Sequence, residues 1–161
     1  AAACVAASPL ERCRQTAELL YPGQAPCVFD QFREMDFGAF EGHNYEELKA
    51  DARYQAWIDS NGTLPFPQGE SREQFQRRCV EGFCKLLKEM WTRERSLSSL
   101  ALVVHGGTIM ALLDAFAEGS YYDYQCANAK GYKGRLSVEF DVAGNVLRDT
   151  IKIADVRKLE E

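Results

Sequence analysis

The sequence predicts an α/β protein built as a three-layer α/β/α sandwich, with a mostly parallel central sheet and a C-terminal hairpin at its edge. Short apolar segments alternate with segments of helical periodicity along most of the chain, which is typical of a parallel sheet covered by helices. Toward the C-terminus, two alternating segments surround Gly144 and Asn145, as in a hairpin. The length of 161 residues suits one domain, expected at residues 1–161.

The first expected helix follows a short apolar strand at residues 3–7. Ser8, Pro9 and Glu11 occupy its N-cap, first and third positions, a capping box with proline where it is favoured. This helix is expected to end near Leu20. The chain should then form a short strand, a loop rich in glycine and aromatic residues, and two short helical segments, at residues 27–29, 32–42, 45–49 and 52–58.

The second half of the chain contains the strongest periodic signals. Ser71 and Gln74 make a second capping box, after which apolar residues recur at helical spacing and predict a long amphipathic helix. Residues 100–104 are apolar on both alternations, which indicates a strand covered on both faces. The remaining expected elements are one helix and the two hairpin strands, at residues 108–116, 135–141 and 146–153.

Composition and charge narrow the functional classes. The formal net charge is −5. Because proteins that bind nucleic acid carry clustered lysine and arginine side chains, nucleic acid is not expected as the main partner. No apolar run is long enough to cross a bilayer, and the N-terminus lacks the basic start of a signal peptide, so a cytoplasmic protein without membrane contact is expected. The six cysteines are expected to be thiols rather than disulfides or zinc ligands, because none forms a CxxC pair.

His105 stands at the end of the strand expected at residues 100–104, where ligands bind in open parallel sheets. Gly106 and Gly107 follow it and expose backbone N–H groups at the start of the next helix, which suits an anion. A simpler structural role, in which His105 only caps the helix, fits the same residues. Both interpretations remain open at this point.

Arg12 and Glu34 are the other candidate site residues. Arg12 lies in the first turns of the helix after the first strand, where a guanidinium can bind phosphate with two hydrogen bonds; Arg14 lies about 200° around that helix and should point elsewhere. Glu34 lies between Phe32 and Phe37, whose apolar surroundings suit a carboxyl that must hold a proton. The alternatives are a solvated helix face for Arg12 and a hydrophobic plug with solvated acids for the loop.

Four motifs together resemble the histidine phosphatase (phosphoglycerate mutase-like) superfamily in order and spacing. They are SPLERCRQTAE at residues 8–18, FREMDFGAFEG at 32–42, FPQGES at 66–71 and VVHGG at 103–107. The resemblance implies that Arg12 is a phosphate-pocket arginine, Glu34 the proton donor and His105 the second pocket histidine. It also implies a reaction through a phosphohistidine that requires no metal or other cofactor.

The nucleophile of that family is a histidine in an Arg-His-Gly motif at the end of the first strand, and this sequence contains no such motif. Its only histidine besides His105 is His43, which is expected at the surface. We therefore expect the domain to be N-terminally incomplete, to lack the family's first strand and to be inactive without it. Truncation, supply of that strand by another segment, and a degenerate non-catalytic relative all fit the sequence.

Within the family, the resemblance is greatest to small phosphomonoesterases, including α-ribazole phosphatase of cobalamin biosynthesis. Mutases of the family carry a long insertion, whereas only about one short helical segment fits between Gly42 and Gly69. Gln68 and Met110 depart from the common pattern. We expect a phosphatase acting on a small phosphorylated metabolite; a phosphoglycerate-mutase-type enzyme and a phosphate-binding module without turnover are the alternatives. The oligomeric state is not predicted.

Overall fold

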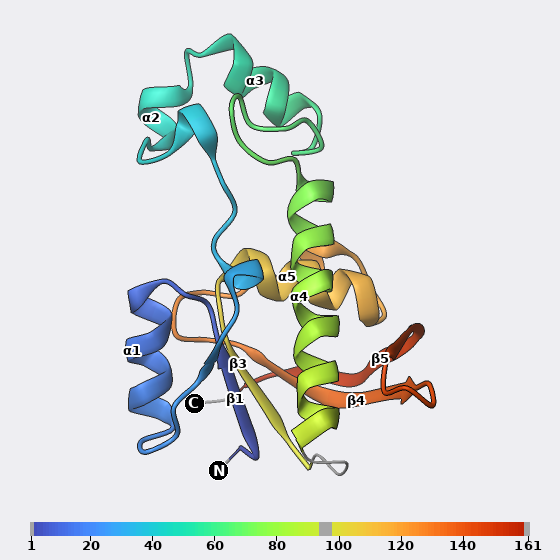
Figure 1. The fold of residues 1–161 in the computed structure, drawn as a ribbon. Coiled ribbons are helices and arrows are strands. Elements are labelled where there is room, and N and C mark those ends of the chain that lie inside the picture. The colour runs from blue at the N-terminus through green and yellow to red at the C-terminus, as the bar shows by residue number, and fades with distance from the viewer. Residues whose placement is uncertain (1, 94–97, 160–161) are drawn as a thin grey trace. The chain divides into compact units, whose positions relative to one another are not determined.

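The computed structural model describes residues 2–93 and 98–159 (Figure 1). The chain divides into two compact units, the first made of Ala1–Glu34 with Arg78–Glu161 and the second of Met35–Arg77. The helices and strands in chain order are β1 (Cys4–Ala7), α1 (Glu11–Leu20), β2 (Cys27–Val28), α2 (Tyr45–Leu48), α3 (Ala52–Asp59), α4 (Arg72–Arg93), β3 (Leu100–Val103), α5 (Gly106–Phe116), β4 (Tyr132–Phe140) and β5 (Val146–Lys158). None of the helices in these described ranges is long and apolar enough to span a membrane.

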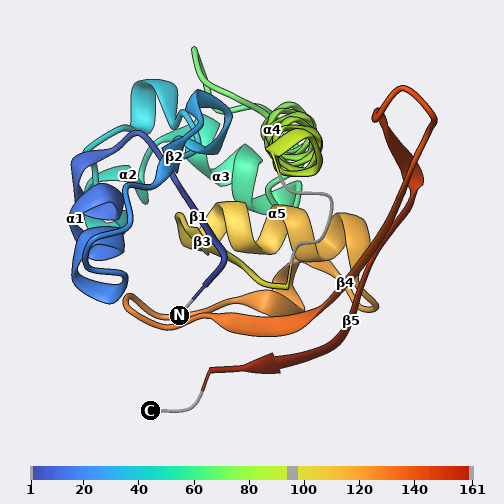
Figure 2. The same ribbon diagram turned by 60° about the horizontal axis from the view of Figure 1, so that its bottom comes forward.

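Three parallel strands form the sheet of the first unit, in the order β2-β1-β3. Ala7 of β1 pairs with Val28 of β2 on one side and with Val103 of β3 on the other, so the three strands end at the same level. In this unit, α1 flanks the strands on one side, and α5 and the part of α4 from Arg78 onward flank them on the other (Figures 1 and 2). The predicted mixed α/β class is confirmed.

The C-terminal strands β4 and β5 pair antiparallel, as predicted, and extend further than the expected segments. Within the described residues they form their own two-stranded sheet and do not continue the parallel one. Trp91 of α4 stacks on Phe140 of β4, with ring centroids 4.5 Å apart. All four residues of β3 are half-buried, not covered on both faces as predicted, which accords with the place of β3 at the end of the strand order.

Apolar side chains from α1 and α4 fill the core of the first unit. Ala17 of α1 packs on Val5 and Ala7 of β1, and the helical repeat that predicts α4 is its buried face. The buried apolar side chains of α4 in this unit are those of Cys79, Val80, Phe83, Leu86, Leu87 and Met90. All six cysteines carry free thiols, as predicted, and two of them, Cys13 and Cys79, are buried.

The second unit is organised around aromatic rings. Phe66 stacks on Trp57 with ring centroids 4.8 Å apart and meets the edges of Phe37 and Phe40. Between Gly42 and Gly69 the structure has the two short helices predicted at residues 45–49 and 52–58, α2 and α3, so the estimate that only about one short helical segment fits there is wrong. The capping box of Ser71 and Gln74 is confirmed, because the Gln74 N–H donates to Ser71 Oγ at 3.1 Å and the Ser71 N–H donates to Gln74 Oε1 at 2.9 Å.

Candidate active site

The candidate site lies where the parallel strands of the first unit end. Ser8 follows β1 directly and donates its N–H to the carbonyl of Val103 at the end of β3, at 3.1 Å. This pairing brings the start of α1 next to His105, which precedes α5. Glu34 comes from the segment after β2, whose Phe29 N–H donates to the Ala7 carbonyl at 3.2 Å. Three segments far apart in the chain therefore meet at one sheet edge, as ligand sites in parallel sheets do.

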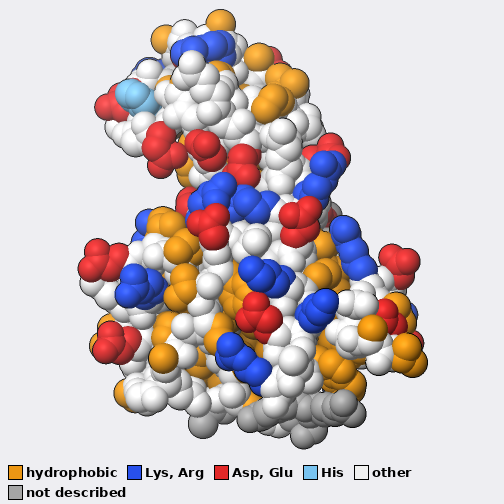
Figure 3. Space-filling model, in the orientation of Figure 1, with side chains coloured by type: hydrophobic (Ala, Val, Ile, Leu, Met, Phe, Trp, Pro, Cys, Tyr) orange, Lys and Arg blue, Asp and Glu red, His pale blue; other side chains and the backbone are white. Residues whose placement is uncertain are grey.

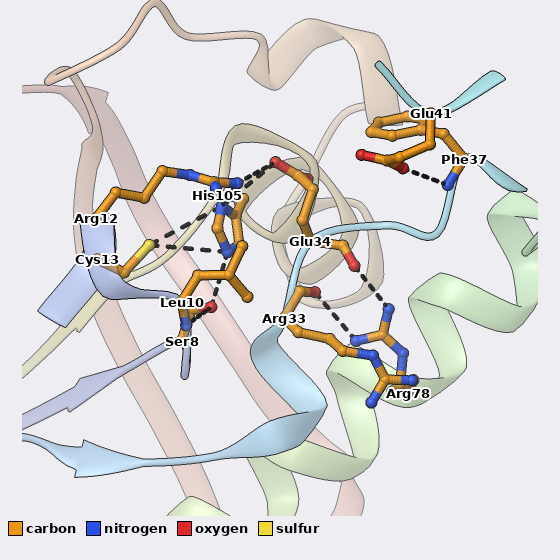
Figure 4. Close-up of polar contacts among 10 residues, drawn as sticks. All are labelled: Ser8, Leu10, Arg12, Cys13, Arg33, Glu34, Phe37, Glu41, Arg78 and His105. Carbon is orange, nitrogen blue, oxygen red and sulfur yellow. Dashed lines mark hydrogen bonds and ion pairs between the residues drawn. The ribbon is translucent and has the colours of Figure 1, made fainter.

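Arg12, Glu34 and His105 are in mutual contact (Figure 4). Arg12 Nη2 donates to Glu34 Oε2 at 3.3 Å and to His105 Nδ1 at 3.1 Å, and His105 Nδ1 lies 3.3 Å from the same Glu34 oxygen. The Arg12 side chain is 60% exposed and that of Glu34 is 31% exposed, whereas that of His105 is 3% exposed. The cluster thus has one buried member and two that solutes can reach.

Ser8 has a different role from the one predicted. Helix α1 begins at Glu11 with Leu10 as its N-cap, so the predicted capping box of Ser8 and Glu11 is wrong. The Ser8 hydroxyl is fully buried; it lies 2.7 Å from His105 Nε2 and accepts the Leu10 N–H at 3.3 Å. Contact with a histidine distant in sequence takes the place of the local cap.

His105 does not use its ring to cap α5 in the described structure, so the alternative structural role is not what the geometry supports. Burial lowers the pKa of His105 below its ordinary value of 6.5, the Glu34 carboxylate opposes that shift, and the charges of Arg12 and Arg78 add to it. The Cys13 sulfur lies 3.7 Å from Nε2 and 3.9 Å from Nδ1, and burial raises the pKa of this thiol. Burial therefore favours the neutral form of the ring.

Arg78 of α4 holds the backbone that carries Glu34. Its guanidinium donates to the carbonyl oxygens of Gln31 at 2.9 Å, Arg33 at 3.1 Å and Glu34 at 3.3 Å (Figure 4). One turn further along α4, a Cβ on Gly82 would come within 2.5 Å of Gln31 Cβ, so only glycine allows this close approach. Both residues therefore set the position of the backbone that leads to Glu34.

The other predicted residues have mixed outcomes. Of the aromatic rings expected around Glu34, Phe32 packs on Phe29 and Phe37 packs on Phe66. Gly106 is the first residue of α5, directly after His105. His43 is exposed and lies 3.3 Å from Glu47 in the second unit, as expected for a surface residue.

Sequence reasoning missed Ser8, Cys13 and Arg78 as neighbours of the site. Ser8 could have been found, because it directly follows a strand that ends beside the one preceding His105. Cys13 follows Arg12 and looked like an ordinary buried thiol. Arg78 gives no sequence signal, since it lies 44 residues from Glu34 on a long helix and only the fold brings them together.

A guanidinium, a carboxyl and an imidazole at the end of a parallel sheet can bind an oxyanion and move a proton. Glu34 Oε2 lies 3.3 Å from both Arg12 Nη2 and His105 Nδ1, between the guanidinium and the imidazole. On the face of the molecule in Figure 3, basic and acidic side chains are interspersed. Fold and geometry together define an α/β protein with a cluster of polar and charged side chains at its strand ends.

The profile of the histidine phosphatase superfamily (branch 1) matches residues 1–148, and the chain belongs to this superfamily. A protein called "Putative phosphoserine phosphatase 2" from Hydrogenobacter thermophilus is 31% identical over 110 residues, which cover 66% of this chain and 51% of that protein. The chain thus spans about half the length of this curated relative.

Two solved structures illustrate the range of relatives. Phosphoglycerate mutase from Thermus thermophilus is 28% identical with a TM-score of 0.55, over 89% of this chain and 70% of that one. The α-ribazole phosphatase from Shigella flexneri is 20% identical with a TM-score of 0.67, over 96% of this chain and 74% of that one. At 20% identity, the similarity to the α-ribazole phosphatase shows a shared fold alone.

Proposed function

We propose that this chain carries the phosphate-binding and proton-donating part of a phosphomonoesterase site that works through a phosphohistidine. The observation that carries the proposal is the contact of Arg12, Glu34 and His105 within 3.3 Å at the ends of three parallel strands. Transfer of a phosphoryl group needs these three functions: a cation to hold its oxygens, a hydrogen-bond donor beside it, and an acid for the leaving oxygen.

Each residue has a separate role in the proposed reaction. Arg12 binds two phosphoryl oxygens, and His105 donates from Nδ1 to a third once it is protonated. The N–H of Gly106, at the start of α5, is a further donor for the same group. Glu34 in its protonated form gives its proton to the leaving alkoxide as the P–O bond breaks, and its carboxylate then takes a proton from the water that attacks the phosphohistidine.

The nucleophile in this proposal is a histidine of an Arg-His-Gly segment, as the family resemblance implies. The 161 residues contain two histidines. His105 has its Nε2 in contact with Ser8 and its Nδ1 in contact with Arg12, and the exposed His43 lies 3.3 Å from Glu47. Neither suits an attack on phosphorus at Arg12, so turnover is proposed to require that further segment.

The finer proposal is a phosphatase for a small phosphorylated metabolite, in the cytoplasm, with α-ribazole 5′-phosphate as the first substrate to test. Support comes from the short segment between Gly42 and Gly69, which holds only the four-residue α2 and the eight-residue α3. A mutase is the second candidate, because the mutase from Thermus thermophilus is 28% identical to this chain.

The test compares two proteins, the 161-residue chain and the same chain preceded by a segment with the Arg-His-Gly motif. We expect both to bind vanadate and only the longer one to release phosphate from phosphomonoesters. Incubation of the longer protein with 3-phosphoglycerate distinguishes hydrolysis from isomerisation to 2-phosphoglycerate. Vanadate binding without turnover by either protein would favour the phosphate-binding module, and turnover by the 161-residue chain with phosphate on His105 would make that residue the nucleophile.

A further inference from the structure

The contact between Ser8 and His105 does not belong to the proposed reaction as described so far. The two side chains lie 2.7 Å apart, that of Ser8 is fully buried and that of His105 is 3% exposed. A buried contact of this length between two polar groups is a hydrogen bond protected from water, and such bonds set side-chain orientation.

Ser8 contacts His105, and His105 contacts Glu34, in the same order as the serine, histidine and acid of a serine hydrolase triad. The geometry nevertheless argues against Ser8 as a nucleophile. A nucleophile must meet its substrate, and Ser8 is completely buried. Its oxygen already accepts the Leu10 N–H and lies 2.7 Å from His105 Nε2. The hydroxyl is therefore a structural partner of the imidazole.

The direction of the Ser8–His105 hydrogen bond follows from the opposite side of the ring. His105 Nδ1 lies 3.1 Å from Arg12 Nη2, which can only donate, and 3.3 Å from Glu34 Oε2, a carboxylate oxygen that already accepts from Arg12. The guanidinium makes the shorter contact, so in the neutral ring Nδ1 is the acceptor, and the proton resides on Nε2 and points at Ser8 Oγ. The buried Ser8 oxygen then accepts this proton together with the Leu10 N–H.

We propose that Ser8 is a positioning residue: its hydroxyl accepts the Nε2 proton of His105, which holds the ring so that Nδ1 is the atom that meets an anionic ligand. The part of this inference that concerns the anion rests on the proposed function, whereas the part that concerns the tautomer rests on the geometry alone. When a tetrahedral dianion binds Arg12 and displaces the singly charged Glu34 carboxylate from it, the negative charge beside Nδ1 increases, and Nδ1 takes up one proton from solvent while Nε2 keeps its own. Anion binding and protonation of His105 are therefore coupled.

Every charged or titratable group that faces the ring enters this coupling. Arg12 and Arg78 stay charged at all relevant pH values and favour the neutral ring before the anion binds. Glu34 favours the charged ring, and it competes with the anion for Arg12. Burial keeps the Cys13 thiol protonated, so it does not titrate in the same range.

The test is ¹⁵N NMR of the imidazole nitrogens in the 161-residue chain with His43→Gln, which leaves His105 as its only histidine. We expect the neutral Nε2–H tautomer in this protein, and a mixture of tautomers after Ser8→Ala. Ser8→Thr restores the hydroxyl and should restore the Nε2–H tautomer. Cys13→Ala is the matched control, since it removes another contact with the ring and should leave the tautomer unchanged.

Sulfate serves as the anion, because it does not titrate near neutral pH. We expect sulfate to convert Nδ1 from an acceptor to a protonated nitrogen and to bind about 2- to 10-fold more weakly after Ser8→Ala, the range for one lost hydrogen bond. Glu34→Gln should keep the change at Nδ1, which separates the titration of His105 from that of Glu34.

The outcomes separate the two proposals. An Nδ1–H tautomer in the parent chain, or one unchanged by Ser8→Ala in a folded variant, overturns the inference about Ser8 even if sulfate binds. Sulfate that leaves both ring nitrogens unchanged overturns the anion half of the inference together with the proposed phosphate site. Both proposals are supported if the parent chain has the Nε2–H tautomer, Ser8→Ala loses it, Ser8→Thr restores it, and sulfate protonates Nδ1.

Discussion

The two units of the chain have centres of opposite character. The first unit gathers polar side chains whose partners are up to 97 residues apart, as for Ser8 and His105. The second gathers aromatic rings from one continuous segment, with Phe66, Trp57 and Phe40 at its middle. Aromatic rings are stabilised by burial in many different arrangements. The polar side chains of the first unit, in contrast, come into contact only because three strands end at the same level. Stability and chemistry are therefore expected to respond to different residues.

The largest expected effect is on the chemistry of the first unit. With the Arg-His-Gly segment present, Glu34→Gln should slow phosphorylation by alkyl phosphates about 10²–10⁴-fold, the range for general acid catalysis, and affect p-nitrophenyl phosphate much less. The reason is that an alkoxide must be protonated as it leaves, whereas p-nitrophenolate leaves unaided. Single-turnover phosphoenzyme formation measures the step directly.

The control for Glu34 is Glu41→Gln, since Glu41 belongs to the second unit and accepts the Phe37 N–H at 3.3 Å. This variant should not distinguish the two substrates. Equal losses on both substrates for Glu34→Gln would mean that Glu34 only positions the phosphoryl group, and the acid would have to be found elsewhere.

Substitutions in the aromatic centre should lower the stability of the second unit. Phe66 is 5% exposed and contacts three other rings, so Phe66→Ala should cost about 3–5 kcal/mol, the usual range for removing a buried phenyl ring. Hydrogen exchange should show the loss of protection within residues 35–77. Tyr45→Ala, at an exposed ring, should cost about 0.5 kcal/mol. Equal loss of protection in β1 and β3 would show that the two centres are energetically coupled.

Arg12→Ala should weaken vanadate binding by about 1.5–3 kcal/mol with little change in the denaturation midpoint, because it removes a charge-assisted contact from an exposed side chain. Arg14→Ala, two residues along the same helix, is the matched control and should bind as the parent does. Isothermal titration measures both. Unchanged binding in Arg12→Ala would assign it to the solvated face of α1.

Arg78→Lys should reduce the contribution of Glu34 without removing the carboxyl. A lysine keeps the charge but cannot donate from one fork to three carbonyl oxygens. We expect up to about 10²-fold slower phosphorylation by alkyl phosphates, the scale of effect for a displaced catalytic group. A loss equal on alkyl and p-nitrophenyl phosphates would indicate a role in general stability.

The smallest expected effect concerns pH. The pKa of His105 is lowered by burial, so the unfolded chain binds its proton more readily, and stability should fall as the pH drops below 6.5 toward the folded-state value. His105→Gln should flatten this part of the profile of urea midpoints measured down to about pH 5. His43→Gln is the control and should leave it unchanged. A profile identical in His105→Gln would show that other groups cause the pH dependence.

The sequence by itself predicted the elements and singled out the three side chains, Arg12, Glu34 and His105, that the structure brings into contact. Helical periodicity predicted α4, alternation predicted the hairpin of β4 and β5, and residues placed after expected strands pointed to Arg12 and His105, because these signals depend only on spacing along the chain. Where local signals compete with tertiary contacts they failed. Ser8 and Glu11 fit a capping box, but the Ser8 hydroxyl gains a buried partner in His105.

Only the tertiary structure decided how the site is held. The register of β1 against β3 places Ser8 next to His105, and α4 brings Arg78 and Gly82 against the backbone before Glu34. None of these contacts has a periodicity or a motif, because each joins residues more than about 40 positions apart whose approach depends on strand register and helix packing. The residue types of the candidate site can thus be recognised from the local sequence. Their orientation, and the ring nitrogen of His105 that carries the proton, depend on the fold.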